Sequence, residues 1–284
     1  VSAGTSTPIK LWDLQGRKLA GECDAAKSHV VALAIDDQAS CVFAGDDEGR
    51  LLIWRPTLGR VERLGGHSDR IRGLAITSDG KRGLSAGGDR SQIWELDRAT
   101  KTASFDHEHL AGPVAIAGDR GHLLAIGESL RVSLSEGKVE ATYSGLGRNA
   151  ECCVCFDQGR RLISGEGKCL ILYDAEAGRI LQSLHAHSAD VEGCAATPTG
   201  DWIVSVGDSQ LKIWPREVWT RPAIGRWSGS RNFVVASPNG RQAIVGGDEY
   251  PLAIVEVGSG QVIGHVEPEG RTNAVAWIDD DRFV

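Results

Sequence analysis

The sequence contains no methionine, and aromatic residues make up only 6% of its 284 positions. No apolar run approaches the roughly 20 residues that a membrane-spanning helix needs. The first ten residues have neither a basic start nor an apolar stretch, so we expect no secretory signal in them. Since methionine is missing even at position 1, we expect a processed chain or a domain cut from a longer protein. We therefore predict a cytoplasmic domain with no membrane partner.

Other absences narrow the chemistry. The net charge of −7 argues against attraction to nucleic acid or to an anionic membrane surface. No G-x-x-x-x-G-K-[ST] phosphate loop is present, and we expect no cofactor. The seven cysteines have no regular spacing, and most lie inside apolar segments. This pattern favours free, buried thiols in a reducing compartment over disulfide bonds.

Glycine, by contrast, is abundant, with 36 residues placed between many short apolar runs. Runs of this length bounded by Gly, Asp and Asn are typical of strands and turns, and no segment of useful length has the helical period. The runs also repeat with a period of about 40 residues. We align the repeats on one tryptophan-like position each, which falls at Trp12, Trp54, Trp94, Ser133, Tyr173, Trp214 and Val255.

Each repeat reads as four short strands, and the first is small and apolar. These first strands are predicted at 30–35, 71–76, 114–117, 152–156, 191–196, 232–236 and 273–277. More mixed fourth strands, such as 180–184 and 262–266, should lie outermost. The step from Val255 through the chain end to Trp12 is as long as the other repeats, so the period closes on itself.

A closed period predicts an all-β fold: a seven-bladed β-propeller of four-stranded antiparallel blades. The terminal segments would complete one blade together, because residues near both ends read as strands of the same repeat. Such pairing covers strand edges that would otherwise invite aggregation. We expect residues 1–284 to form this single propeller domain.

The Gly-His near the start of a unit (Gly66-His67), the Trp-Asp near its end (Trp12-Asp13) and the period resemble the WD40-repeat family. In that family a His, a Ser or Thr, an Asp and a Trp form a buried hydrogen-bonded tetrad within a blade. The resemblance implies two complete structural tetrads here. Their members are His67, Ser85, Asp89 and Trp94 in one unit, and His187, Ser205, Asp208 and Trp214 in the other.

The remaining units depart from this pattern. The second unit keeps Asp47 and Trp54, but Ala26 and Ala44 stand where His and Ser would be. Where one member is lost, we expect the others to be lost or replaced, because a buried polar group without a partner is costly. The corresponding positions hold Ser164, Glu166 and Tyr173 in the fifth unit, Ser133 in the fourth and Val255 in the seventh.

Ser, His and Asp together also suggest a hydrolase triad. Their recurrence at repeat positions beside a Trp favours a structural role, so we expect no catalytic residues. Cys152, Cys153 and Cys155 suggest a metal site, but they lie in a strand. Alternation would place Cys153 and Cys155 on one face and Cys152 on the other. We therefore expect no metal.

The resemblance implies that partners bind on the face carrying two kinds of loop: those between blades and those between second and third strands. Exposed Trp or Tyr beside Arg is a typical anchor composition for protein interfaces. The segment 221–231 reads as such a loop. The predicted partner-binding residues are Trp219, Arg226, Trp227, Arg231 and Tyr250, with Arg70, Arg72, Arg148 and Arg271 near first-strand starts.

The leading hypothesis is a non-enzymatic protein-interaction scaffold or sensor. It would bind a protein or peptide on this face and sit beside another domain of the same longer chain. One alternative is a structural subunit of a large assembly. A less favoured alternative is an enzymatic or ligand-binding propeller that uses the central channel, for which Glu192 and Arg72 would be the nearest polar residues.

Overall fold

A computed structural model shows how these segments are arranged. It describes residues 2–4, 8–13, 18–25, 28–36, 38, 40–88, 90–106, 113–117, 122–125, 130–133, 136–142, 150–216, 223–226, 233–247, 251–267, 272–279 and 282–283.

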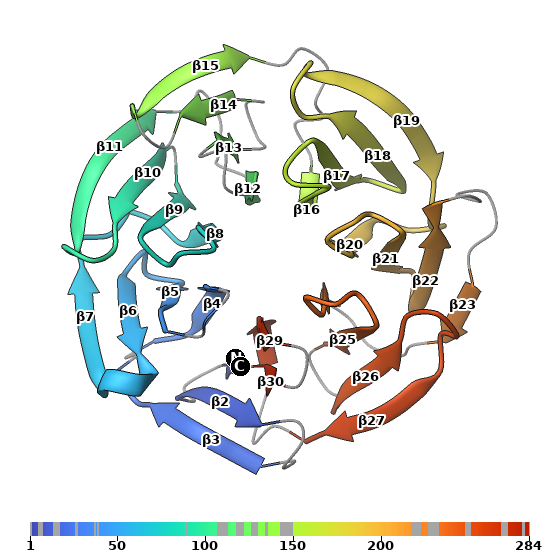
Figure 1. The fold of residues 1–284 in the computed structure, drawn as a ribbon, viewed down its shortest axis with the longest axis horizontal. Helices are drawn as coiled ribbons and strands as arrows, with labels where there is room; N and C mark the ends of the chain where they lie inside the picture. The colour runs from blue at the N-terminus through green and yellow to red at the C-terminus, as the bar shows by residue number, and fades with distance from the viewer. Residues whose placement is uncertain are drawn as a thin grey trace.

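Within these ranges the strands form seven separate sheets, set around a common axis like the blades of a fan (Figure 1). Six of the sheets have four antiparallel strands in sequence order, with the first strand nearest the axis and the fourth on the circumference. The first of these contains β4 (Val30–Ile35), β5 (Val42–Asp46), β6 (Leu51–Arg55) and β7 (Arg60–Leu64). The second contains β8 (Ile71–Ile76), β9 (Arg82–Gly87), β10 (Arg90–Glu95) and β11 (Thr100–Asp106). The third contains β12 (Val114–Ala117), β13 (His122–Ala125), β14 (Leu130–Ser133) and β15 (Lys138–Thr142).

The other three four-stranded sheets follow in the second half of the chain. They contain β16 (Ala150–Phe156), β17 (Arg161–Glu166), β18 (Cys169–Asp174) and β19 (Arg179–His185); β20 (Val191–Ala196), β21 (Trp202–Gly207), β22 (Gln210–Pro215) and β23 (Ala223–Arg226); and β24 (Phe233–Ala236), β25 (Gln242–Gly246), β26 (Leu252–Glu256) and β27 (Val262–Val266). One short 3₁₀ turn, η1 (Pro56–Leu58), links β6 to β7. The expected all-β propeller is confirmed.

The seventh sheet, which we call the chain-end sheet, combines strands from both ends of the sequence. It contains β1 (Ser2–Gly4), β2 (Ile9–Asp13), β3 (Lys18–Cys23), β28 (Thr272–Val275), β29 (Trp277–Asp279) and β30 (Arg282–Phe283). Residue Ser2 of β1 pairs with Val275 on one side and Lys10 on the other, while Phe283 of β30 pairs with Trp12.

This sheet differs from the expected regular four-stranded blade. The position of the second strand is shared by β1 and β30, because both of them pair with β2. The first strand is interrupted between β28 and β29 at Ala276. The sheet thus has more and shorter segments than its neighbours, since one of its strands is contributed by two ends of the chain.

The core lies between adjacent sheets. In the β4–β7 sheet, alternation points Phe43 and Ile53 toward the β8–β11 sheet, where they pack with Ile71 and Trp94. Residues on the opposite face pack against the chain-end sheet, as the cluster containing Ile9, Ala44 and Trp54 shows. Inner and middle strands are therefore apolar on both faces, and burial of each large side chain contributes about 1.5–3 kcal/mol.

Several first strands match the predicted ranges, among them β4, β8, β12 and β20. Their small residues allow close approach near the axis. A Cβ on Gly73 would lie 2.9 Å from the backbone nitrogen of Val114 in the next sheet. No larger residue would fit there without displacing the neighbouring strand. In the described part of the chain, no helix is long and apolar enough to cross a membrane.

Candidate partner-binding face

One face of the ring is built from the turns between second and third strands and from the connections between sheets. We call it the loop face. Backbone hydrogen bonds join its two kinds of loop: Asp47 N–H donates to the carbonyl of His29 (3.0 Å), and His67 N–H donates to that of Gly49 (2.8 Å). The turn of the β4–β7 sheet is thereby held between the connections before and after it. Hydrogen bonds between neighbouring loops therefore hold this part of the loop face in place.

The β20–β23 sheet carries a complete buried hydrogen-bonded brace behind this face. The indole N–H of Trp214 donates to Ser205 Oγ at 2.9 Å, and Ser205 Oγ lies 2.8 Å from His187 Nε2. The other ring nitrogen, Nδ1, lies 2.7 Å from Asp208 Oδ1. This order assigns the Nδ1–H tautomer, because the serine hydroxyl donates to Nε2 while it accepts from the indole. Every side-chain polar atom of the brace has a hydrogen-bond partner.

A tight turn places Asp208 for this role. Asp208 and Ser209 have positive φ angles of 49° and 57°, the conformation of a two-residue type I′ hairpin. Burial opposes ionisation of Asp208, but hydrogen bonds from Ser188 and His187 lower the pKa of its carboxyl to about 2. Burial lowers the pKa of His187 as well, although Asp208 opposes the shift. The pair is thus a neutral imidazole donating to a carboxylate.

The β8–β11 sheet contains the second brace. Trp94 Nε1–H donates to Ser85 Oγ (2.8 Å), which lies 2.7 Å from His67 Nε2. His67 Nδ1 lies 3.1 Å from the carbonyl oxygen of Gly87. The predicted fourth member, Asp89, lies outside the described residues. The described members of this set thus form a Trp–Ser–His chain of hydrogen bonds.

Burial argues against a hydrolytic role for either set. Ser85 and Ser205 are both 0% exposed, and each accepts a hydrogen bond from an indole. A nucleophile must reach its substrate, so these hydroxyls serve the interior of the sheet.

The β16–β19 sheet replaces the histidine with a carboxylate. Both Ser164 Oγ (2.6 Å) and Tyr173 Oη (2.5 Å) donate to Glu166 Oε1. One carboxylate oxygen, with two lone pairs, does the work that imidazole does in the complete braces. The sequence predicted these residues only as a departure from the tetrad, and the structure shows that they form a closed network of their own.

In the β4–β7 sheet, a buried carboxylate at the turn between β5 and β6 is paired with several hydrogen-bond donors. Asp46 is buried and accepts hydrogen bonds from Ser28 Oγ (2.6 Å), Arg50 Nε (2.7 Å) and two backbone N–H groups. Burial raises the pKa of Asp46, but the bonds from Ser28 and Arg50 outweigh it and lower the pKa. Arg50 also pairs with Glu48 at 2.9 Å. This turn is therefore held together by its own hydrogen bonds and ion pairs.

Of the predicted partner-binding residues, Arg70 and Arg72 are described and exposed, beside the start of the inner strand β8. Six others, and Asp89 among the tetrad residues, lie outside the described residues, so their roles stay predictions. The six are Trp219, Trp227, Arg231, Tyr250, Arg271 and Arg148.

The prediction of a continuous loop at 221–231 is wrong in part. Residues Ala223–Arg226 form the outer strand β23, in which Arg226 pairs with Gln210 and Ala223 with Ile213. The short apolar Ala-Ile pair completes the sheet, because the edge of β22 would otherwise expose unpaired backbone groups. Arg226 is therefore a strand residue at the circumference.

The cysteines pack as the alternation predicted. Cys153 and Cys155 lie in a cluster with Ala115, whereas Cys152 packs with the β20–β23 sheet. Burial raises the pKa of the Cys155 thiol to about 12, which keeps it protonated. In the described ranges, no three His, Cys, Asp or Glu side chains converge as metal ligands.

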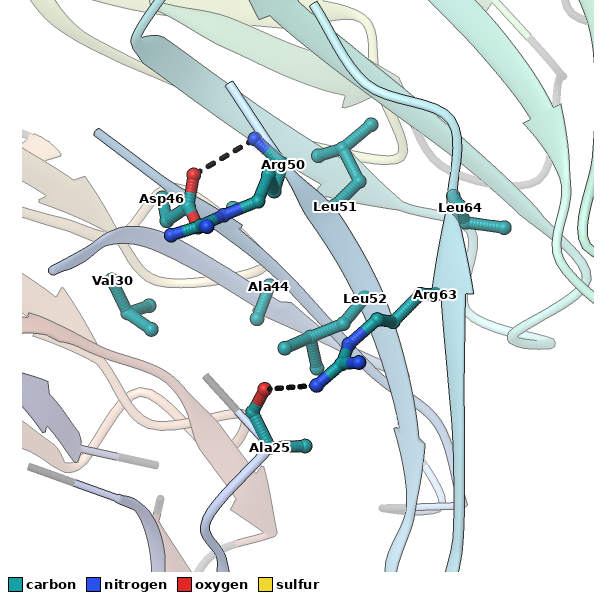
Figure 2. A pocket seen from close by; sticks show the side chains of 10 residues that line it. Ala25, Val30, Ala44, Asp46, Arg50, Leu51, Leu52, Arg63 and Leu64 are labelled. Carbon is teal, nitrogen blue, oxygen red and sulfur yellow. Dashed lines mark hydrogen bonds and ion pairs between the residues drawn. The ribbon is translucent and has the colours of Figure 1, made fainter. Parts of the chain in front are cut away.

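A pocket that sequence reasoning missed opens in the β4–β7 sheet at the loop face (Figure 2). Its volume is about 230 Å³, and Ala44 and Leu52 form part of its wall. The sequence does carry a signal for this pocket, because Ala44 occupies a position where the complete units have serine. The repeat pattern predicts that apolar residues replace the lost tetrad members, but it does not predict that a cavity remains beside them.

Radially arranged four-stranded sheets with buried braces at one repeat position define a β-propeller built from homologous repeats. Comparison with known proteins agrees: the family described as WD domain, G-beta repeat matches residues 178–215, which include all four members of the brace around His187. The chain is thus a β-propeller that is similar to WD40-repeat proteins.

Two curated relatives extend the similarity along the chain. It is 22% identical to striatin of Mus musculus over 268 residues, which cover 76% of this chain and 33% of striatin. It is also 22% identical to autophagy-related protein 16 of Arabidopsis thaliana over 287 residues, covering 98% of this chain and 47% of that protein. The chain thus spans about a third to a half of the length of these relatives.

Proposed function

We propose that this propeller is a non-enzymatic scaffold that binds a protein or peptide on its loop face. The supporting observation is that the buried Ser and His side chains are engaged with Trp, Asp or backbone groups inside the sheets. The chemistry available to a partner then lies in exposed residues at the surface, such as Arg70 before β8 and Arg72 within it. Similarity to WD40 proteins supports the same conclusion.

The proposal includes a seven-bladed ring formed by residues 1–284 as one domain. The seven sheets in the described ranges and the repeat of about 40 residues support it. We further propose a cytoplasmic location and a neighbouring domain in the same longer protein, with no nucleic acid or membrane partner.

A partner-capture experiment with matched variants tests the function. Quantitative pull-down from cells of the source organism would compare the wild type with Trp227→Ala/Arg231→Ala and with Arg70→Ala/Arg72→Ala. We expect one or more stoichiometric partners to be lost from at least one loop-face variant. Lys101→Ala, an exposed change on the outer strand β11, is the control and should retain them. Retention of every partner by both loop-face variants would contradict the assignment.

A further inference from the structure

The pocket in the β4–β7 sheet occupies the place where other sheets keep their braces. Cross-strand register establishes the equivalence. Trp54 pairs with Val42, and Ala44 follows two residues later. In the β8–β11 sheet, Trp94 pairs with Gly83 and the brace serine, Ser85, also follows two residues later. Ala44 therefore stands at the serine position, without the hydroxyl that would fix an imidazole beside it.

The walls of this space are apolar. Val30, Ala44, Leu52 and Leu64 line it, and all four are buried. An apolar cavity of about 150 Å³ is large enough to hold benzene. A pocket of about 230 Å³ therefore has room for a leucine or phenylalanine side chain.

The polar groups at the pocket differ in what they can still bind. Asp46 is occupied by Ser28, Arg50 and two backbone N–H groups, and Arg50 is held between two carboxylates. Arg63 is exposed and donates from Nη2 to the carbonyl oxygen of Ala25 at 3.1 Å (Figure 2). Among the described residues no carboxylate pairs with Arg63, so its remaining N–H donors can serve a ligand.

We propose that this pocket binds the carboxyl terminus of a partner peptide that ends in leucine or phenylalanine. The terminal side chain enters the apolar space, and the terminal carboxylate accepts hydrogen bonds from Arg63. A C-terminal residue carries both groups on one Cα, which suits a compact pocket with a guanidinium at its mouth. The pocket lies at the loop face, so the proposal deepens the proposed function and rests on it for the peptide source.

The test uses the protein as a whole with defined probes. A hexapeptide ending in a free leucine carboxylate is titrated by calorimetry against the wild type, Arg63→Gln and Ala44→Leu. We expect binding by the wild type, at least about tenfold weaker binding by Arg63→Gln because a charge-assisted bond is lost, and none by Ala44→Leu. Arg60→Gln, on the same strand, is the control and should bind normally.

Three further arms decide the ligand. The same peptide with an amidated end should bind at least about tenfold more weakly, since the amide carries no charge. Equal binding of both peptides, or an unchanged affinity in Arg63→Gln, overturns the proposal. Binding of 4-methylpentanoate but not of the peptide identifies a small-molecule site and also overturns it. Amide chemical shifts of residues 44–52 must respond to the peptide in the wild type, which keeps the test valid if Ala44→Leu unfolds.

Failure of the pocket and failure of the proposed function are distinguishable. If the peptide does not bind but the loop-face variants lose partners in the pull-down, the pocket assignment falls and the scaffold function stands. If the peptide binds while every loop-face variant keeps its partners, the pocket is a separate site.

Discussion

At the scale of single residues, the polar side chains of the interior depend on close backbone geometry. His67 reaches Ser85 because its own N–H donates to the carbonyl of Gly49 across the loop face. The residue before it, Gly66, passes directly over that carbonyl, and a Cβ there would overlap the Gly49 oxygen. In the β8–β11 sheet, the glycine that precedes the histidine therefore has a steric cause.

Replacing Gly66 with alanine tests this cause. We expect Gly66→Ala to lower the free energy of unfolding by about 1–3 kcal/mol, the usual cost of overpacking. Urea denaturation followed by tryptophan fluorescence would measure it. Gly65→Ala is the matched control, since a Cβ at Gly65 meets no atom within 4 Å. Equal effects of the two changes would show that the overlap is relieved at no cost.

The imidazole of His187 predicts a pH dependence. Burial lowers its pKa, so the folded protein favours the neutral ring. Its contribution to stability is then complete above the ordinary pKa of about 6.5 and is lost as the pH falls below that value. The free energy of unfolding should drop more between pH 7.5 and 5.5 in the wild type than in His187→Asn. The exposed His185→Asn variant should keep the wild-type slope, and a wild-type slope in His187→Asn would refute the prediction.

At the scale of the strand and sheet, one structural problem has three local solutions. Second and third strands are buried on both faces, so any polar group they carry needs a partner within the sheet. In the β20–β23 sheet the imidazole of His187 bonds to the buried serine, and in the β16–β19 sheet Glu166 does so. In the β4–β7 sheet alanine replaces the serine, and a pocket lies beside it. Decay of the repeat pattern is thus compensated sheet by sheet.

The carboxylate solution can be tested directly. Glu166→Ala leaves the hydroxyls of Ser164 and Tyr173 without their acceptor, and we expect a loss of about 1–3 kcal/mol in unfolding free energy. Glu166→Gln keeps one acceptor oxygen and should lose less. Glu151→Ala, an exposed change in the same sheet, is the control and should be near neutral. A Glu166→Gln effect as large as that of Glu166→Ala would argue against the network.

At the scale of the whole molecule, the ring is joined through the chain-end sheet. Strand β1 lies between β28 and β2, which come from opposite ends of the sequence. Trp277 adds a bond between neighbouring sheets, because its indole N–H donates to the carbonyl of Val235 at 3.0 Å. Long-range pairing of this kind closes the ring and covers edges that would otherwise be open.

Deleting residues 1–4 should weaken this closure. Amides of residues 272–275 lose their pairing with β1, so we expect faster hydrogen exchange there and in β2. The β20–β23 sheet, whose strands do not pair with β1, serves as the internal control and should keep its protection. Unchanged protection at 272–275 would show that β1 contributes nothing to closure.

The sequence by itself determined the repeat, most of the strands and the set of residues that forms the brace around His187. Strands β8 and β20 could be bounded to the residue because apolar runs end at turn residues on both sides. The brace of His187, Ser205, Asp208 and Trp214 could be assigned because its members keep their spacing within one repeat.

Only the tertiary structure decided the features that depend on cross-strand register and on side chains meeting across loops. The closed network of Glu166 with Tyr173 requires two strands to align, and the enclosure of Asp46 requires Ser28 to come from a different loop. Strand β23 forms because β22 offers it an edge, which its own four residues do not predict. The pocket beside Ala44 is a volume between side chains, and a volume is set by packing of distant segments.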